Sequence, residues 1–172
     1  MHSRIIQLTT RPLTADAYIT ESDFDSDHWF LRQIADSVDS DDDRNGTLDM
    51  LKGWLKKHDP FVGALIPFKD EDGEGFILEH EYKEAYFADK YRHFKAALDK
   101  LCSSVSLEGY SDWLTRNDML VCMSDLIRQW RDEFGIYIAS DSAYELNTLD
   151  NFIRKASYGV KYYFGGTLNY HW

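Results

Sequence analysis

The densest group of potential ligand atoms in the chain lies at residues 39–50, which read DSDDDRNGTLDM and include five aspartates. Calcium ions in proteins bind carboxylate, amide and main-chain carbonyl oxygens. Residues that can supply such oxygens recur at every second position of this stretch, namely at Asp41, Asp43, Asn45, Thr47 and Asp49. This spacing indicates a candidate calcium site, to which Thr47 would contribute its main-chain carbonyl.

Residues 41–52 resemble the calcium-binding loop of EF-hand proteins, with Gly46 at the family's glycine position and Leu48 at its aliphatic position. The resemblance implies a divalent-cation module with a helix on each side. The last position departs from the family, because Lys52 stands where an EF-hand has a bidentate Glu, and we find no second loop of this kind. The alternative is an acidic connection between two helices, in which Asn45–Gly46 forms a turn with positive φ.

A second potential site is the pair His80 and Glu84, which are four residues apart and would share one face of a helix. This histidine and this carboxylate could supply two ligands of a metal site. Such a site would indicate a metal-dependent enzyme that uses His80 and nearby carboxylates. The alternative is a solvent-facing start of a helix. Neither Cys102 nor Cys122 lies in a nucleophile motif, so we predict no catalytic residue.

Negative charge dominates the chain and is concentrated in its first half. The net charge is −11; residues 1–90 hold 20 Asp and Glu against 10 Lys and Arg, whereas residues 91–172 hold 10 against 9. Such a field repels nucleic-acid phosphates and anionic lipid head groups, and it attracts basic protein surfaces or cations. We therefore predict no direct binding of nucleic acid and no membrane association. The alternative is that the acidity serves only solubility.

The acids form two clusters that together would make a binding surface. Carboxylates spaced along a rigid surface can imitate a nucleic-acid backbone, so that a basic groove accepts the protein as a competitor. The sequence thus predicts a non-enzymatic interaction protein that binds a basic protein surface, with nucleic-acid-mimicking inhibition as one form of that binding. The residues of the predicted binding surface are Asp23, Asp25, Asp27, Asp36, Asp39, Asp41, Asp42, Asp43, Asp49, Asp70, Glu71, Asp72 and Glu74.

Hydrophobic periodicity predicts the elements that would position these residues. We expect a helix that begins after Thr20 or Ser22 and bears Phe24, Trp29 or Phe30, Ile34 and Val38 on one face. Further helices are expected over about 48–58, 80–103, 116–134 and 148–157, and strands over 4–10, 61–68, 76–80, 136–139 and 158–166. The residues of the helix over 116–134 that we expect to face the interior are Met119, Met123, Leu126, Ile127 and Trp130. This order of elements predicts one α+β domain over residues 1–172, with a largely antiparallel or mixed sheet packed by about five helices.

The sequence predicts a cytoplasmic protein with no cofactor other than the candidate calcium ion. Its first residues, MHSRIIQLTTRPLT, lack an apolar run long enough for a signal peptide. No stretch reaches the roughly 18 consecutive apolar residues of a membrane span. Two cysteines make no disulfide framework, which favours a reducing compartment.

Overall fold

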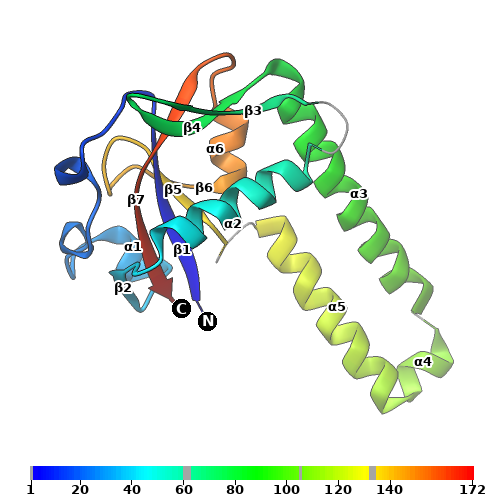
Figure 1. Ribbon diagram of the computed structural model, residues 1–172. Coiled ribbons are helices and arrows are strands. Elements are labelled where there is room, and N and C mark those ends of the chain that lie inside the picture. The colour runs from blue at the N-terminus through cyan, green and yellow to red at the C-terminus, as the bar shows by residue number, and fades with distance from the viewer. Residues whose placement is uncertain (1, 60–62, 105, 132–134) are drawn as a thin grey trace.

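The first and last strands of the chain lie side by side at the centre of one sheet (Figure 1). The computed structural model describes residues 2–59, 63–104, 106–131 and 135–172. β1 (His2–Thr9) pairs antiparallel with β7 (Lys161–His171) along almost its full length. β7 is buried from Tyr162 to Leu168. The strands formed by the two ends of the chain therefore lie in the interior of the fold and not at its edge.

Seven strands make up the sheet, in the order β3-β4-β7-β1-β5-β6, and β2 pairs with the edge of β7 that also binds β4. β1 and β5 run parallel, whereas the other pairs run antiparallel. The remaining strands are β2 (Ser37–Ser40), β3 (Leu65–Asp70), β4 (Gly73–Leu78), β5 (Tyr137–Ala139) and β6 (Leu146–Thr148). The predicted single α+β domain with a mixed, largely antiparallel sheet is confirmed.

Helices cover both faces of the sheet. Within the described residues they are α1 (Trp29–Gln33), α2 (Arg44–Lys57), α3 (His80–Ser104), α4 (Leu107–Ser111), α5 (Trp113–Arg131) and α6 (Leu149–Lys155), with 3₁₀ turns η1 (Ala15–Ala17) and η2 (Glu21–Asp23). Successive residues of β1 point to opposite faces. Ile6 and Leu8 join a core with α2, the start of α3 and α6, whereas Ile5 joins a second core with α1. None of these helices combines the length and the apolar character that crossing a membrane requires.

The predicted helix after Thr20 is wrong over most of its length. The short turn η2, the five-residue helix α1 and strand β2 replace it. β2 forms because its backbone pairs with β7 between Leu168 and His171, at the other end of the chain. The spacing did indicate a buried face, since Phe24 and Phe30 are buried, but it did not determine the backbone conformation.

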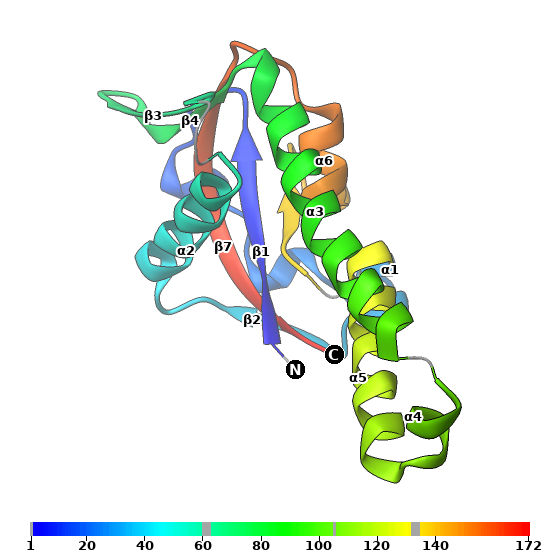
Figure 2. The same ribbon diagram turned by 90° about the vertical axis from the view of Figure 1, so that its right-hand side faces the viewer.

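α3 and α5 form a helical hairpin that extends away from the sheet, with α4 at its tip (Figures 1 and 2). The helix predicted over 80–103 is confirmed by α3. Tyr82 and Tyr86, near its start, belong to the core beneath α2. Farther along the hairpin, α3 packs against α5.

The predicted inward face of α5 is only partly correct. Leu126 is buried and Met119 is half-buried, but Met123, Ile127 and Trp130 are exposed. Periodicity shows which residues share a face of a helix, but an extended hairpin offers only one neighbouring helix to cover that face.

A buried histidine joins the end of α2 to α3. Nδ1 of His58 lies 2.8 Å from a carboxylate oxygen of Asp89, and both side chains are buried. Burial lowers the pKa of His58 below its usual value of 6.5, because the Asp89 hydrogen bond and charge only partly offset the desolvation, and nearby Lys90 and Lys57 lower this pKa further.

We expect the free energy of unfolding to fall, in a way that depends on His58, as the pH drops below about 6.5. The unfolded chain takes up a proton near pH 6.5, whereas folded His58 resists protonation, so this stability is present above that pH and is lost as the pH falls below it. Denaturant titrations at several pH values should show a smaller pH dependence for His58→Gln than for the wild type.

The control is His80→Gln, which removes an exposed histidine and should leave the pH dependence unchanged. Equal pH dependence in the wild type and in His58→Gln would contradict the assignment.

Candidate protein-binding surface

Two segments that are distant in the sequence meet beside the carboxyl ends of β1 and β5. One contains η1 and η2 and follows β1, and the other is the loop between β5 and β6. Asp16 and Asp23 of the first segment and Asp141 of the second line one pocket with a volume of about 380 Å³. Three carboxylates therefore surround a single opening.

A second pocket, of about 210 Å³, adjoins the first, since Tyr18 and Ile19 line both. Asp41, from the loop between β2 and α2, adds a carboxylate to this pocket. Glu21 joins η2 to β2, because its carboxylate accepts hydrogen bonds from the backbone N–H (3.1 Å) and the hydroxyl (2.9 Å) of Ser40. We define the acidic loop face as Asp16, Glu21, Asp23, Asp41 and Asp141.

The side chain of Gln7 holds the first segment against the sheet. Gln7 is buried. Its amide oxygen accepts hydrogen bonds from the backbone N–H groups of Ile19 (3.1 Å) and Gly166 (3.0 Å), and its amide nitrogen donates to the carbonyl of Ala17 (3.3 Å). These three bonds satisfy a buried polar group and order the loop between η1 and η2.

A β-bulge makes room for Gln7. Ile6 pairs with Thr167 and Leu8 with Phe164, so two residues of β7 oppose the single residue Gln7. One of the two is Gly165, where an added Cβ would lie 2.4 Å from the amide oxygen of Gln7. The bulge therefore requires a residue without a side chain at this position.

Arg44 attaches the start of α2 to the same bulge. Its guanidinium donates to the carbonyls of Gly165 (2.9 Å) and Phe164 (3.2 Å) and lies over the ring of Tyr18, at 5.1 Å from the ring centroid. Asp41 accepts a hydrogen bond from the hydroxyl of Thr167 (2.7 Å). Arg44 and Asp41, which both line the smaller pocket, are thus hydrogen-bonded to β7.

Within the acidic loop face, Asp41 is the acid with cations nearby, because Arg44 lines the same pocket and the charge of Arg4 helps to lower its pKa. Burial alone would raise the pKa of Asp41, but hydrogen bonds from Thr47 and Thr167 outweigh this and hold the pKa below its usual range. A hydrogen bond from Thr14 lowers the pKa of Asp16. Within the described part of the chain, the ion pairs involve other carboxylates, and none includes Asp16, Glu21, Asp23 or Asp141.

The expected EF-hand geometry is not formed. α2 begins at Arg44, so Asn45, Thr47 and Asp49 lie in helix instead of in a loop. Asp43 is the N-cap, because its carboxylate accepts a hydrogen bond from the N–H of Gly46 (3.0 Å). Because this cap starts the helix at Arg44, Thr47 lies in α2, and its carbonyl is not part of a loop that could surround an ion. Among the described residues, no group of three or more His, Cys, Asp or Glu side chains is placed to hold a metal ion.

Of the other acids predicted in the first cluster, some are engaged locally and others are exposed. Asp27 pairs with Arg32, and Asp39 lies 3.3 Å from His171. Asp25 accepts a hydrogen bond from the backbone of Asp27. Asp43 caps α2, and Asp49 lies 3.3 Å from Nζ of Lys52. The remaining members, Asp36 and Asp42, are exposed.

The second predicted cluster, Asp70, Glu71, Asp72 and Glu74, is not continuous with the acidic loop face. It lies at the β3–β4 turn. Gly75 of β4 lies opposite Tyr163 of β7 and Ser40 of β2 opposite Leu168, a separation of roughly 17 Å along the strand. Lys161 and Lys52 also partly neutralise it through Asp70 and Glu74. The prediction that both clusters make one binding surface stays a prediction.

Sequence reasoning missed three members of the acidic loop face, namely Asp16, Glu21 and Asp141. Asp141 could have been found, because it follows the predicted strand 136–139, and loops after strands often bear functional groups. It also missed the His58–Asp89 pair, for which the sequence offers no local signal. His80, by contrast, is exposed, with its ring 4.9 Å from that of Tyr158.

The chain matches no known protein family, and no match is found among curated proteins or solved structures. The geometry of the chain itself is therefore the basis for a functional proposal.

We expect Gly165→Ala to lower the free energy of unfolding by about 1–3 kcal/mol, which is the usual cost of an overpacked interior. The new methyl group would displace Gln7 and break its three hydrogen bonds. Denaturant unfolding monitored by circular dichroism measures the change.

The matched control is Gly53→Ala in α2, where no atom lies within 4 Å of the added Cβ. This helix-interior substitution should instead stabilise the protein by about 1 kcal/mol. A Gly165→Ala variant as stable as the wild type would show that the bulge does not depend on glycine.

Proposed function

We propose that this chain is a non-enzymatic interaction protein that binds a basic protein surface through its acidic loop face. The observation that supports this most directly is the pocket lined by Asp16, Asp23 and Asp141, none of which takes part in an ion pair within the described part of the chain. Like charges held together without a counter-ion destabilise a fold. A cationic partner removes that repulsion.

The pocket has the chemistry of a receptor for an arginine or lysine side chain. Carboxylates accept charge-assisted hydrogen bonds from a guanidinium or ammonium group. The exposed ring of Tyr144 forms part of the wall, and aromatic faces attract such cations. Arg44 of the chain itself lies over the ring of Tyr18 and so provides an internal example of this contact.

Nucleic-acid mimicry is the form of binding that this surface favours. The acids are held on a rigid support, because Gln7 fixes the loop between η1 and η2 and because Thr20 and Asp23 form a capping box. A partner groove built for phosphates would meet carboxylates at fixed positions. The chain would then act as an inhibitor in the cytoplasm, without contacting nucleic acid or membranes itself.

An oligo-arginine peptide provides a direct test by isothermal titration calorimetry. We expect the triple variant Asp16→Asn, Asp23→Asn, Asp141→Asn to bind the peptide roughly 10-fold more weakly than the wild type, since three partly screened charge contacts are lost. Binding to the wild type should weaken as salt rises.

The control triple variant Asp70→Asn, Glu71→Gln, Asp72→Asn changes the net charge equally at the second cluster. It should bind almost as well as the wild type. Equal weakening by both triple variants would show that the peptide senses only net charge, and it would refute the acidic loop face as a site.

A further inference from the structure

α5 bears an apolar stripe on a side that α3 leaves largely uncovered. We define this outer seam as Trp113, Leu120, Met123, Ile127 and Trp130. All five residues are exposed, the two tryptophans by 73% and 78%. Together with Arg116 they are spaced alternately by three and four positions, which is the spacing of a helix-pairing seam in coiled coils and four-helix bundles.

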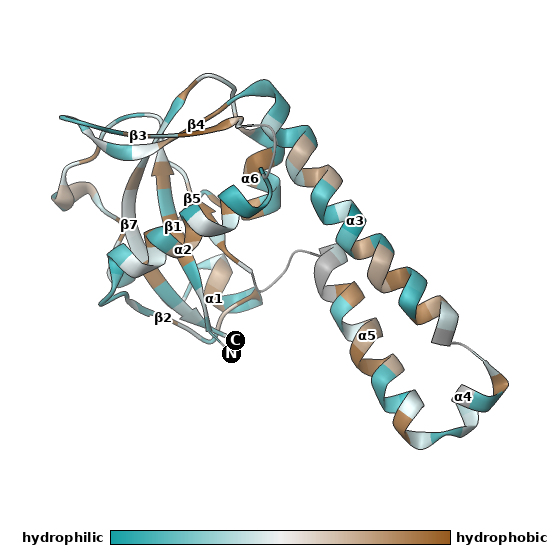
Figure 3. Ribbon diagram, turned by 45° about the vertical axis from the view of Figure 1, so that its right-hand side comes forward, coloured by the Kyte–Doolittle hydropathy of each residue, from teal (hydrophilic) through white to brown (hydrophobic). Residues whose placement is uncertain are grey.

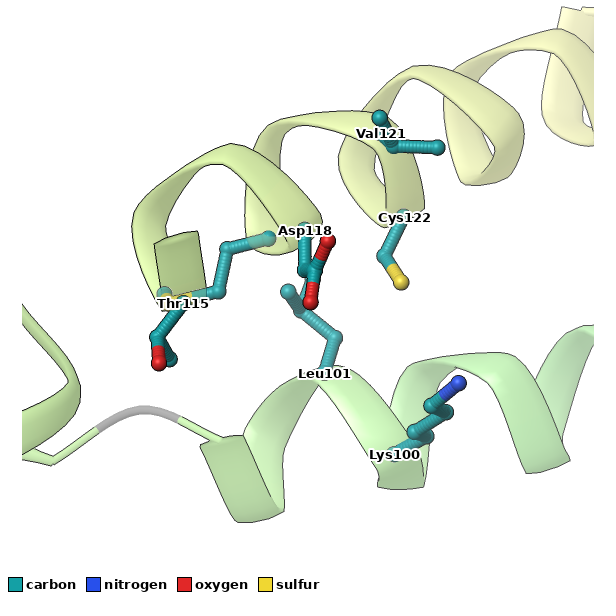
Figure 4. A pocket seen from close by; sticks show the side chains of 7 residues that line it. Lys100, Leu101, Thr115, Asp118, Val121 and Cys122 are labelled. Carbon is teal, nitrogen blue, oxygen red and sulfur yellow. The ribbon is translucent and has the colours of Figure 1, made fainter. Parts of the chain in front are cut away.

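α3 covers a different side of α5. A cavity between the two helices, with a volume of about 380 Å³, is lined by Leu101, Met119 and Cys122. Figure 4 shows Cys122 directed toward α3 and Leu101 directed toward α5, whereas Val121 points away from α3. At 3.6 residues per turn, the inner residues lie about 100° around the helix from the outer seam.

Most of the outer seam therefore has no cover within the described part of the chain. Trp130 approaches the ring of Phe94 on α3, with the ring centroids 5.7 Å apart, but it stays largely exposed. Figure 3 shows hydrophobic segments along α5 although the hairpin stands apart from the sheet. A contiguous apolar surface of this kind on a folded domain marks an interaction site.

The residue pattern of the seam is symmetric about its centre. Trp113 is seven positions before Leu120, and Trp130 is seven positions after Met123. An antiparallel pairing of two identical helices, with a two-fold axis between Leu120 and Met123, would place each Trp113 against Trp130 of the other copy. A two-fold interface requires such self-complementarity. We propose that α5 binds α5 of a second copy of this chain, so that the two hairpins form a four-helix bundle.

The charges of the hairpin fit a second copy better than a basic partner. The hairpin, residues 80–131, holds eight Lys and Arg against eight Asp and Glu, a balance of 0 in a chain of net charge −11. The hairpin therefore does not attract a strongly basic surface, and it does not repel its own copy. Arg116 would lie opposite Ile127, where its aliphatic stem can cover the apolar side chain.

The ends of the paired helices are also complementary. Asp112 precedes Trp113 at the tip of the hairpin, and hydrogen bonds from Thr115 hold the pKa of its carboxyl below the usual range. Arg154 and Trp130 line one pocket at the other end of α5. Antiparallel pairing brings the Asp112 end of one copy to the Arg154 end of the other.

The exposed area of the seam supplies a large part of what a stable contact needs. At 150–250 Å² per large aromatic side chain, the two tryptophans alone offer roughly 300 Å². The three aliphatic residues of the seam add to this, against the about 800 Å² per partner that a standard interface buries.

Analytical ultracentrifugation of the full chain at micromolar concentration tests the proposal. We expect a dimer for the wild type. Leu120→Glu should raise the dissociation constant by about 100-fold or more, because it would place an unpaired charge in the interface. Met123→Lys should have a similar effect. Both residues are exposed in the monomer, so circular dichroism and thermal melting should show an unchanged fold.

Mixing these two variants provides the decisive measurement, because antiparallel pairing puts the introduced glutamate of one chain against the introduced lysine of the other. The mixture should form a heterodimer although each variant alone is monomeric. Leu114→Glu is the control, since Leu114 is equally exposed on α5 but lies outside the seam, and this variant should remain a dimer. A monomeric wild type, a dimer that Leu120→Glu leaves intact, or a mixture that stays monomeric would each overturn the proposal.

Discussion

The antiparallel pairing of β1 with β7 is the interaction on which the rest of this structure depends. It joins the two ends of the chain, and β2, β4 and β5 then pair with one of these two central strands. Its single irregularity, the bulge opposite Gln7, orders the segment that follows β1 and provides the carbonyls that bind Arg44. One backbone irregularity in the sheet thus determines where both the η1–η2 segment and the start of α2 lie.

This dependence explains how acids from separate segments come to line two adjoining pockets. Asp23 is positioned by a capping box with Thr20, and Asp41 by the hydroxyl of Thr167 on β7. The hydrogen bonds to Asp41 hold its pKa below the usual range, and Arg44 lines the same pocket. Asp16, Asp23 and Asp141, by contrast, take part in none of the ion pairs of the described residues. Repulsion among these carboxylates would lower the stability of the isolated chain, which is the physical reason for proposing a cationic partner.

The two surfaces of the molecule differ in chemistry and are separated in space. The acidic loop face belongs to the part of the fold built on the sheet, and the outer seam belongs to a hairpin that extends from it (Figure 2). If both proposals hold, a dimer would display two acidic faces at once. Binding two basic sites on one target or assembly would then be favoured by effective concentration, without any additional contact at either face.

The sequence by itself determined the elements whose signals are local. Alternating and helical spacings predicted β1, strands near β3 and β4, α3 and α6, and the excess of acid over base predicted a charged surface in the first half of the chain. Tertiary structure alone decided three further features. β2 exists because β7 offers it an edge. The candidate calcium loop is helical from Arg44, because Asp43 caps α2 and Arg44 binds the bulge of β7. Ile127 and Trp130 are exposed because the hairpin leaves the core. The physical reason is the same in each case: a periodic pattern specifies which residues share a face, whereas the neighbour that covers the face comes from a distant part of the chain or from another molecule.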